Sequence, residues 1–157
     1  MEITSRDTEY VKTVLCLGGF DDPIGPSRLA EEMDISRVAA LKKMRRLEEL
    51  GLGEYVDSKG LLISDKGLDF VKEEARKHHL VERFLQKSLD LEHDVACGEA
   101  SKIASNFSDD LLRVLSDSFV FDKPCDCGFE ASGETDVEDL LNCPWISRRN
   151  NEKGGGG

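Results

Sequence analysis

A chain of 157 residues that is 39% apolar and 34% charged can bury one compact domain or two small ones. Its apolar runs all fall short of the roughly 18 residues needed to cross a membrane. Residues 1–7 lack the basic and then apolar pattern of a secretory signal, so we expect a cytoplasmic protein with no membrane partner. The net charge of −11 argues against nucleic-acid binding unless the cations are gathered in one place.

Three helices are predicted in the first part of the chain. The first covers about residues 8–17, where apolar side chains repeat at helical spacing before two glycines. A short second helix is expected over 26–33, and Ser36 is expected to cap a third helix that ends near residue 50. The apolar positions that we expect on the buried face of this third helix are Val38, Leu41, Met44, Leu47 and Leu50.

Two short strands are predicted next, over about residues 53–56 and 61–64, with a turn between them. The order helix, short helix, turn, helix and hairpin is typical of a winged helix-turn-helix. In that fold the second helix of the pair enters the major groove of DNA, and the hairpin wing reaches the flanking backbone.

Residues 37–46 carry five cations and no anion, although the chain as a whole is acidic. One interpretation is a solvated helix face, since basic helices are common. Their position on the predicted recognition helix favours contact with double-stranded DNA instead. The candidate DNA-binding residues are Ser36, Arg37, Lys42, Lys43, Arg45 and Arg46 of this helix and Lys59 of the wing.

The second half of the chain resembles a known family of regulators. The segment RKHHLVERFL at 76–85 is similar to the start of the metal-binding and dimerisation domain of the DtxR/MntR family, the bacterial and archaeal iron- and manganese-dependent repressors. Residues 28–52 and 60–79 resemble the winged helix and connecting helix of that family. Residues 95–115 occupy the place of its second ligand-bearing helix, and KPCDCG resembles its short Cys-Pro-His-Gly motif. The resemblance covers roughly residues 8–128.

Carried over residue by residue, the resemblance implies an incomplete set of metal ligands. Glu9, His78 and Glu82 stand at family ligand positions, and Cys97 replaces a histidine of the ancillary site. Lys12 stands where the manganese members have an acidic residue. The three further primary-site positions carry no metal ligand and are Ser101, Ala104 and Ser105. The resemblance therefore does not imply the usual Mn2+ or Fe2+ site.

The fold class implied by pattern and resemblance together is mostly α with a small β-hairpin wing. An N-terminal winged helix-turn-helix precedes a helical dimerisation and metal-binding domain. We expect a DNA-binding domain over 1–72, a helical dimerisation and metal-sensing domain over 73–120, a cysteine-containing segment over 121–149 and a disordered tail over 150–157.

Five cysteines in a reducing compartment favour metal or redox chemistry over structural disulfides. Cys16 lies among apolar residues of the first helix and is interpreted as a small core residue. Four thiolates suit a tetrahedral Zn2+ site or an iron–sulfur cluster, and soft sulfur ligands select against Mn2+. The predicted ligands of this site are Cys97, Cys125, Cys127 and Cys143. Unligated thiols and a redox disulfide switch are the alternatives.

A second metal site is also possible at Glu9, His78 and Glu82. It would be a mixed site in which His78, Glu82 and Cys97 are completed by Glu9 or Cys125. His78 and Glu82 are four residues apart and share one helix face, which fits either a ligand pair or an exposed pair on a solvated helix. The neighbouring His79 is interpreted as a packing residue, and His93 as a residue that begins a helix.

These observations predict a regulator that responds to Fe2+, Zn2+ or an iron–sulfur cluster and binds a palindromic operator as a homodimer, as repressors of this kind do. The alternative is a metal-independent or thiol-redox-responsive winged-helix transcription factor. The chain has no phosphate-binding glycine loop, Ser/His/Asp set or paired acid–base motif, so we do not expect an enzyme.

Overall fold

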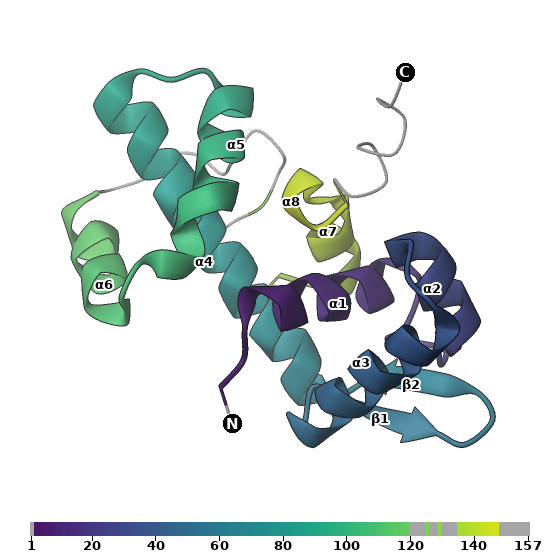
Figure 1. Ribbon diagram of the computed structural model, residues 1–157. Helices are drawn as coiled ribbons and strands as arrows, with labels where there is room; N and C mark the ends of the chain where they lie inside the picture. Colours follow the sequence, from purple (N-terminus) through teal and green to yellow (C-terminus); the bar gives the residue numbers. More distant parts are fainter. Residues whose placement is uncertain (1, 120–124, 126–128, 130–134, 148–157) are drawn as a thin grey trace, which may run out of the picture. The chain divides into compact units, whose positions relative to one another are not determined.

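The computed structural model, which describes residues 2–119, 125, 129 and 135–147, is mostly helical with one antiparallel hairpin (Figure 1). The elements in chain order are α1 (Ser5–Cys16), α2 (Pro26–Met33), α3 (Arg37–Glu49), β1 (Gly53–Val56), β2 (Gly60–Ile63), α4 (Asp65–Leu89), α5 (His93–Ile103), the 3-10 turn η1 (Ala104–Asn106), α6 (Asp109–Ser118), α7 (Val137–Asn142) and α8 (Pro144–Ser147). This order confirms the predicted fold class. None of the described helices is both long and apolar enough to span a bilayer.

The chain forms two compact units, and the boundary between them falls inside α4, between Val71 and Lys72. Local caps explain where the helices of the first unit begin. Thr4 and Asp7 form a reciprocal capping box at α1, and the Ser36 hydroxyl accepts a hydrogen bond from the Ala39 amide at α3.

The hairpin wing pairs Gly53 with Ile63 and Val56 with Gly60. Gly60 has a φ of +128°, and a Cβ there would collide with the carbonyl of Ile24, so only glycine fits. An isolated bridge between Ile24 and Leu61 adds the loop before α2 to the hairpin. The second strand begins at Gly60, one residue earlier than predicted.

The buried face of α3 differs from the predicted stripe. Ala40, Met44 and Leu47 are buried, whereas Val38 is 77% exposed. An α-helix turns about 100° per residue, so positions at strict steps of three drift away from one face. Val38 is turned about 120° away from Met44, and it lies on the solvent side with the cations.

The second unit packs the C-terminal part of α4 against α5 and α6. Its core consists of Leu80, Val81, Leu85, Ala96, Ala100, Ala104, Leu112 and Leu115. The sequence patterns assigned no helix to residues 121–149, but α7 and α8 form there, with Leu140 and Ile146 buried. Asp136 caps α7 and Pro144 begins α8. The predicted tail over 150–157 lies outside the described residues.

Candidate metal centre and DNA-binding surface

Helix α4 buries three titratable side chains in the second unit. His78, His79 and Glu82 are 1%, 2% and 0% exposed. His78 and Glu82 are one helical turn apart and share a face. A solvated His–Glu pair on the helix surface is therefore excluded.

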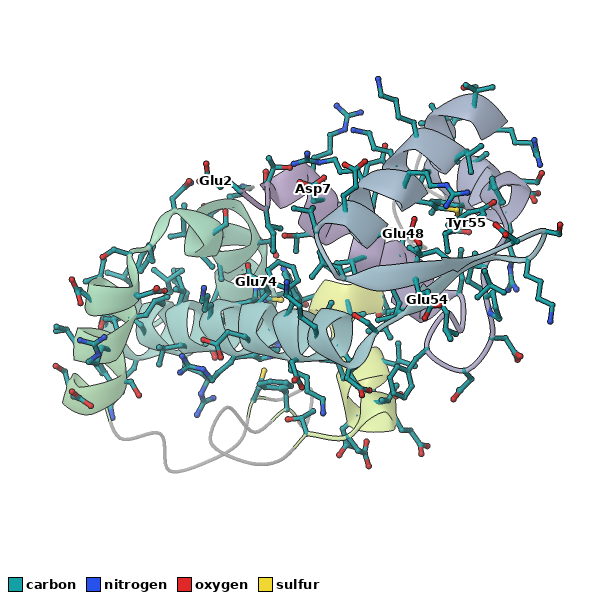
Figure 2. All side chains as sticks on the ribbon, turned by 90° about the horizontal axis from the view of Figure 1, so that it is seen from below. Glu2, Asp7, Glu48, Glu54, Tyr55 and Glu74 are labelled. Atoms are coloured by element: carbon teal, nitrogen blue, oxygen red, sulfur yellow. The ribbon has the colours of Figure 1, made fainter. Side chains whose placement is uncertain are left out.

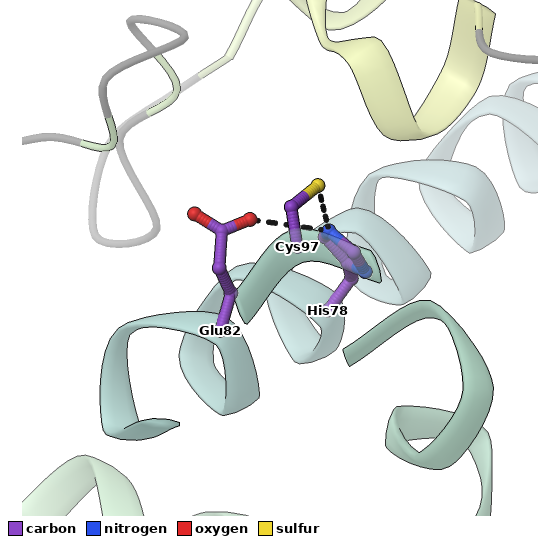
Figure 3. A group of neighbouring side chains, drawn as sticks. All are labelled: His78, Glu82 and Cys97. Atoms are coloured by element: carbon purple, nitrogen blue, oxygen red, sulfur yellow. Dashed lines mark hydrogen bonds and ion pairs between the residues drawn. The ribbon is translucent and has the colours of Figure 1, made fainter. Parts of the chain in front are cut away.

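The first group of donor atoms, which we call the Cys97 group, consists of His78, Glu82 and Cys97 (Figure 3). His78 Nε2 lies 3.3 Å from Glu82 Oε2 and 3.4 Å from Cys97 Sγ. All three donor atoms lie within 4.8 Å of one another. Helices α4 and α5 thus bring together three residues that the family resemblance placed at metal-ligand positions.

The second oxygen of Glu82 meets another set of donors. The Cys125 thiol donates to Glu82 Oε1 at 2.9 Å. His93 Nε2 lies 3.2 Å from the same oxygen and 3.3 Å from Cys125 Sγ. We call Glu82, His93 and Cys125 the Cys125 group.

His79 lies beside the Cys125 group, and its Nε2 is within 4.8 Å of the donor atoms of Glu82 and Cys125. Its Nδ1 is 2.7 Å from the Ala75 carbonyl, which can only accept, so Nδ1 carries the proton. The Nε2 atom on the other side of the ring then faces Glu82 and Cys125, which is the orientation that metal-binding histidines adopt. The same Nε2 is 3.5 Å from Cys143 Sγ.

Aromatic rings from the C-terminal segment cover the two histidines. Trp145 stacks on His78 with ring centroids 5.3 Å apart, and Phe129 stacks on His79 at 4.2 Å. The segment that carries Cys125 and Cys143 therefore also contributes apolar cover to the buried donor atoms.

The electrostatics of Glu82 reflect its neighbours. Burial raises the pKa of the carboxyl, but the short contacts with His78 and Cys125 and the nearby histidine charges outweigh it, so the pKa lies below its ordinary value. In the described part of the chain, the ion-pair partners of Glu82 are both histidines. Its Oε2 is buried and accepts no well-aligned hydrogen bond there. A divalent cation would compensate this buried carboxylate, so the residues present fit a metal ion.

The cysteines of the predicted four-cysteine site contact other kinds of side chain. Cys97 contacts His78, Cys125 contacts Glu82 and His93, and Cys143 contacts His79. Within the described residues, neither group of candidate ligands contains two cysteines. Cys127, the remaining predicted ligand, lies outside the described residues.

Two residues of α1, in the first unit, were also assigned from the sequence. Glu9 was predicted as a possible metal ligand, and Cys16 as a small core residue. Glu9 is 3.1 Å from the ammonium of Lys12, which is 4% exposed, so its carboxylate already has a cationic partner. Burial raises the pKa of the half-buried Cys16 thiol to about 11, which keeps it protonated at neutral pH and unsuited to metal binding.

The family's primary-site positions cannot supply ligands in this chain. Ala104 is buried and has no donor atom, and Ser105 is exposed. The hydroxyl of Ser101 donates to the Cys97 carbonyl at 2.8 Å. The buried imidazole and thiol groups lie instead around Glu82.

The cations of α3 lie in two environments. Arg37 and Lys42 are exposed, as is Lys59 in the wing. Arg46 forms a two-pronged ion pair with the buried carboxylate of Asp7, at 2.8 and 2.9 Å. Arg46 therefore stabilises the first unit, and we leave it out of the proposed DNA contacts.

Two other cations of α3 lie over aromatic rings. The Arg45 guanidinium is 4.0 Å from the centroid of Tyr55 and 3.1 Å from the Glu48 carboxylate (both labelled in Figure 2). Lys43 lies 5.5 Å from the centroid of Tyr10. Each keeps its charge near the helix surface, but neither is as free to move as an isolated side chain.

Three residues of these surfaces were missed at the sequence level. His79 was assigned to packing and His93 to the start of α5, which it does begin, yet both lie beside Glu82. The signal for His93 was its spacing of four residues from Cys97, and for His79 its place beside a candidate ligand. Val38 was placed in the core, although its helical phase puts it on the exposed face.

Two family profiles match the chain. The iron dependent repressor N-terminal DNA binding domain matches residues 2–61, and the iron dependent repressor metal binding and dimerisation domain matches residues 64–130. The HTH-type transcriptional regulator MJ0568 of Methanocaldococcus jannaschii is 30% identical over 93 residues, which are 59% of this chain and 74% of that protein.

Solved structures share the fold. The hypothetical protein SSo2273 from Sulfolobus solfataricus aligns with a TM-score of 0.73 at 18% identity, over 83% of this chain and all of that one. ScaR with bound Zn2+ aligns with a TM-score of 0.68 at 26% identity, over 82% of this chain and 60% of its own. The manganese regulator SloR gives 0.58 at 27% identity, over 78% and 57%. The chain therefore belongs to the DtxR/MntR family of metal-dependent, DNA-binding transcriptional regulators, and it is not an enzyme.

Proposed function

We propose that this protein is a homodimeric regulator that binds a palindromic double-stranded operator and responds to Fe2+ or Zn2+ held by the Cys97 group. The observation that carries the proposal is the burial of His78, Glu82 and Cys97 within 4.8 Å of one another. A buried carboxylate beside a thiol and an imidazole is costly unless a cation compensates it. Because the proposed partner is genomic DNA, we place its action in the cytoplasm.

The donor types favour particular metals. One nitrogen, one oxygen and one sulfur form a set of intermediate softness, which suits Zn2+ and Fe2+ better than Mn2+. The bound ion would supply positive charge next to Glu82 and would join α4 to α5. A thiolate is a softer ligand than an imidazole, so Cys97 in place of the family's histidine changes which ion the site favours.

DNA binding is assigned to α3 and the wing. Arg37, Lys42 and Lys59 are exposed and can reach phosphates, while Ser36 at the helix N-terminus can donate its hydroxyl. Val38 is 77% exposed on the same helix, and its side chain fits contact with a thymine methyl group. Lys43 and Arg45 complete the positive surface.

The proposed dimer interface includes α6. Leu111 and Val114 of this helix are 43% and 57% exposed, in a unit whose family profile is a dimerisation domain. Exposed apolar side chains near one another on a helix are typical of an interface. Sedimentation should therefore give a dimer for the intact chain and a monomer for Val114→Glu; a wild-type monomer would contradict this part of the proposal.

An iron–sulfur cluster at Cys97, Cys125, Cys127 and Cys143 is the second candidate for the signal. The contacts of Cys97, Cys125 and Cys143 with histidines or Glu82 support the mixed site over the cluster. Anaerobic purification with iron, zinc and acid-labile sulfide analysis separates them. Stoichiometric sulfide with visible absorbance would favour the cluster, and metal without sulfide would favour the mixed site.

The central experiment measures DNA affinity with and without metal. Operators are selected from random duplexes by the full chain in Zn2+ or anaerobic Fe2+, and affinity is then measured by fluorescence anisotropy. We expect metal to change affinity at least tenfold, within the usual range of coupling between sites. Cys97→Ser should remove this change, and Cys16→Ser, a matched control in the first unit, should keep it.

Each other result identifies a rival. Affinity that neither metal nor chelator changes would establish a metal-independent winged-helix factor. Affinity that follows oxidant and reductant instead would establish the thiol-redox alternative. Failure to select any duplex would remove the DNA-binding proposal itself.

A further inference from the structure

The carboxylate of Glu82 lies between two sets of donor atoms, one at each oxygen. Oε2 is on the side of the Cys97 group, 3.3 Å from His78 Nε2. Oε1 is on the side of the Cys125 group, 3.2 Å from His93 Nε2 and 2.9 Å from Cys125 Sγ. A carboxylate with separate donors at each oxygen has the arrangement of a bridging ligand.

The three atoms of the Cys125 group form a closed triangle. The third side, from His93 Nε2 to Cys125 Sγ, is 3.3 Å. Ligands about 2.0–2.3 Å from a tetrahedral ion lie roughly 3.3–3.8 Å from one another, so the triangle is close to the face of such a site. His93 is one helical turn before Cys97 on α5, and this spacing directs the two ligands to neighbouring positions.

His79 supplies a fourth donor. Its Nδ1 donates to the Ala75 carbonyl at 2.7 Å, so Nε2 is the ring atom that faces the site, where it also lies 3.5 Å from Cys143 Sγ. That Nε2 is within 4.8 Å of the donor atoms of Glu82 and Cys125. Two nitrogens, one oxygen and one sulfur complete a tetrahedral set for a borderline ion.

We propose that the Cys125 group and His79 form a second metal position, with Glu82 as the ligand shared between the two ions of a dinuclear centre. The proposal deepens the proposed function, because it takes the Cys97 group as its other half. Zn2+ fits both positions, since each contains one thiolate and at least one imidazole.

The second position would connect the C-terminal segment to metal occupancy. Cys125 and Phe129 both belong to this segment. The amide of Cys125 donates to the carbonyl of Phe129, and the Phe129 ring stacks on His79. Loading the second ion would tie that segment to α4 and α5 through Cys125. A regulator with this arrangement has two steps of metal loading rather than one.

The test is a titration of the metal-free full chain with Co2+ without oxygen, following the thiolate-to-cobalt absorbance and the total bound metal. The wild type should bind two ions per chain. Cys125→Ser and His93→Gln should each bind one ion and keep the absorbance from Cys97. Cys97→Ser should lose the absorbance from the Cys97 thiolate and keep that from Cys125.

Two controls keep the result interpretable. Cys16→Ser should still bind two ions, because its thiol lies in the first unit. Fluorescence of Trp145, the single tryptophan, reports folding of the segment around His78 in each variant. One ion in the wild type, with Cys125→Ser unchanged, would overturn the second position and leave the proposed function intact. No bound ion in a folded wild type would overturn both.

Discussion

Among the described residues, each unit of this protein buries one carboxylate, and the two are compensated in different ways. Asp7 in the first unit is 2% exposed and is paired with the guanidinium of Arg46 (Asp7 is labelled in Figure 2). Glu82 in the second unit is 0% exposed and faces His78, His93 and the Cys125 thiol. One partner set has a fixed charge, and the other consists of groups that can exchange a proton for a metal ion.

The difference separates a structural ion pair from a candidate sensor. A guanidinium is charged at every accessible pH, so the compensation of Asp7 does not depend on conditions. Imidazoles and a thiol are neutral or charged according to their surroundings, so the compensation of Glu82 depends on protons and metal. Buried charge marks both places, but only the type of partner tells which of them can respond to a signal.

The largest expected effect breaks the comparison at Glu82. Glu82→Gln keeps the shape but removes the charge and the bridging oxygen. At a metal concentration 100 times the dissociation constant, one bound ion should stabilise the wild type by about 2.7 kcal/mol, and the variant should gain almost nothing. Urea unfolding of both proteins, with Zn2+ and with chelator, measures the two gains.

The chelated proteins provide the control for this variant. Without metal, Glu82→Gln should be less stable than the wild type, because it loses the ion-pair contacts with His78 and His93. The gain from Zn2+ is therefore compared within each protein. A variant that still gained the full stabilisation from Zn2+ would show that the ion binds elsewhere.

The next effect breaks the comparison at Asp7. Arg46→Met leaves the buried carboxylate without its cation while keeping the apolar stem of the side chain. The midpoint of thermal unfolding should fall by several degrees, equally with metal and with chelator. Arg45→Met, which removes an exposed ion pair on the same helix, should change the midpoint by much less. A metal-dependent loss in Arg46→Met would contradict the assignment of the Asp7–Arg46 pair to structure alone.

Much of the fold could be predicted from the sequence, because caps and periodicity act locally. Ser36, the glycines after α1 and the turn of the wing fix element boundaries within a few residues, and α2 ends where expected. The short helices α7 and α8 could not be predicted. Six and four residues are too few for a periodic pattern, and these helices depend on buried contacts of Leu140 and Ile146.

The candidate site was predicted only in part. His78, Glu82 and Cys97 came from the family resemblance, and the structure brings their donor atoms together. His79 and His93 were missed because a single histidine in a helix carries no periodic signal, and its role depends on what packs against it. The positions of the cysteines in the sequence alone do not show which side chains each thiol contacts. The contacts are His78 for Cys97, Glu82 and His93 for Cys125, and His79 for Cys143.

A smaller effect tests the surface of the first unit without touching its buried ion pair. Lys42→Ala removes one exposed cation of α3. DNA affinity should fall roughly threefold to tenfold near physiological salt, and the slope of log affinity against log salt should drop by about 1. Metal stoichiometry should stay the same. Glu49→Ala on the same exposed side should not weaken binding, and a salt slope unchanged in Lys42→Ala would remove this residue from the interface.

The smallest effect sharpens the comparison through pH. The hydrogen bond from Arg46 holds the pKa of Asp7 well below its usual range, despite the opposing effect of burial. A carboxylate with a lowered folded pKa contributes stability that is complete above its unfolded pKa of about 4 and is lost as pH falls toward the folded value. The stability difference between wild type and Asp7→Asn should therefore stay constant from pH 7 to about pH 5 and shrink below about pH 4. As the pH falls, the Zn2+-dependent gain should be lost before the Asp7 contribution is, because protons compete with metal for imidazole and thiolate ligands. Urea unfolding across this range, with and without Zn2+, measures both losses, and a common pH midpoint for them would mean that the two carboxylates are compensated in the same way.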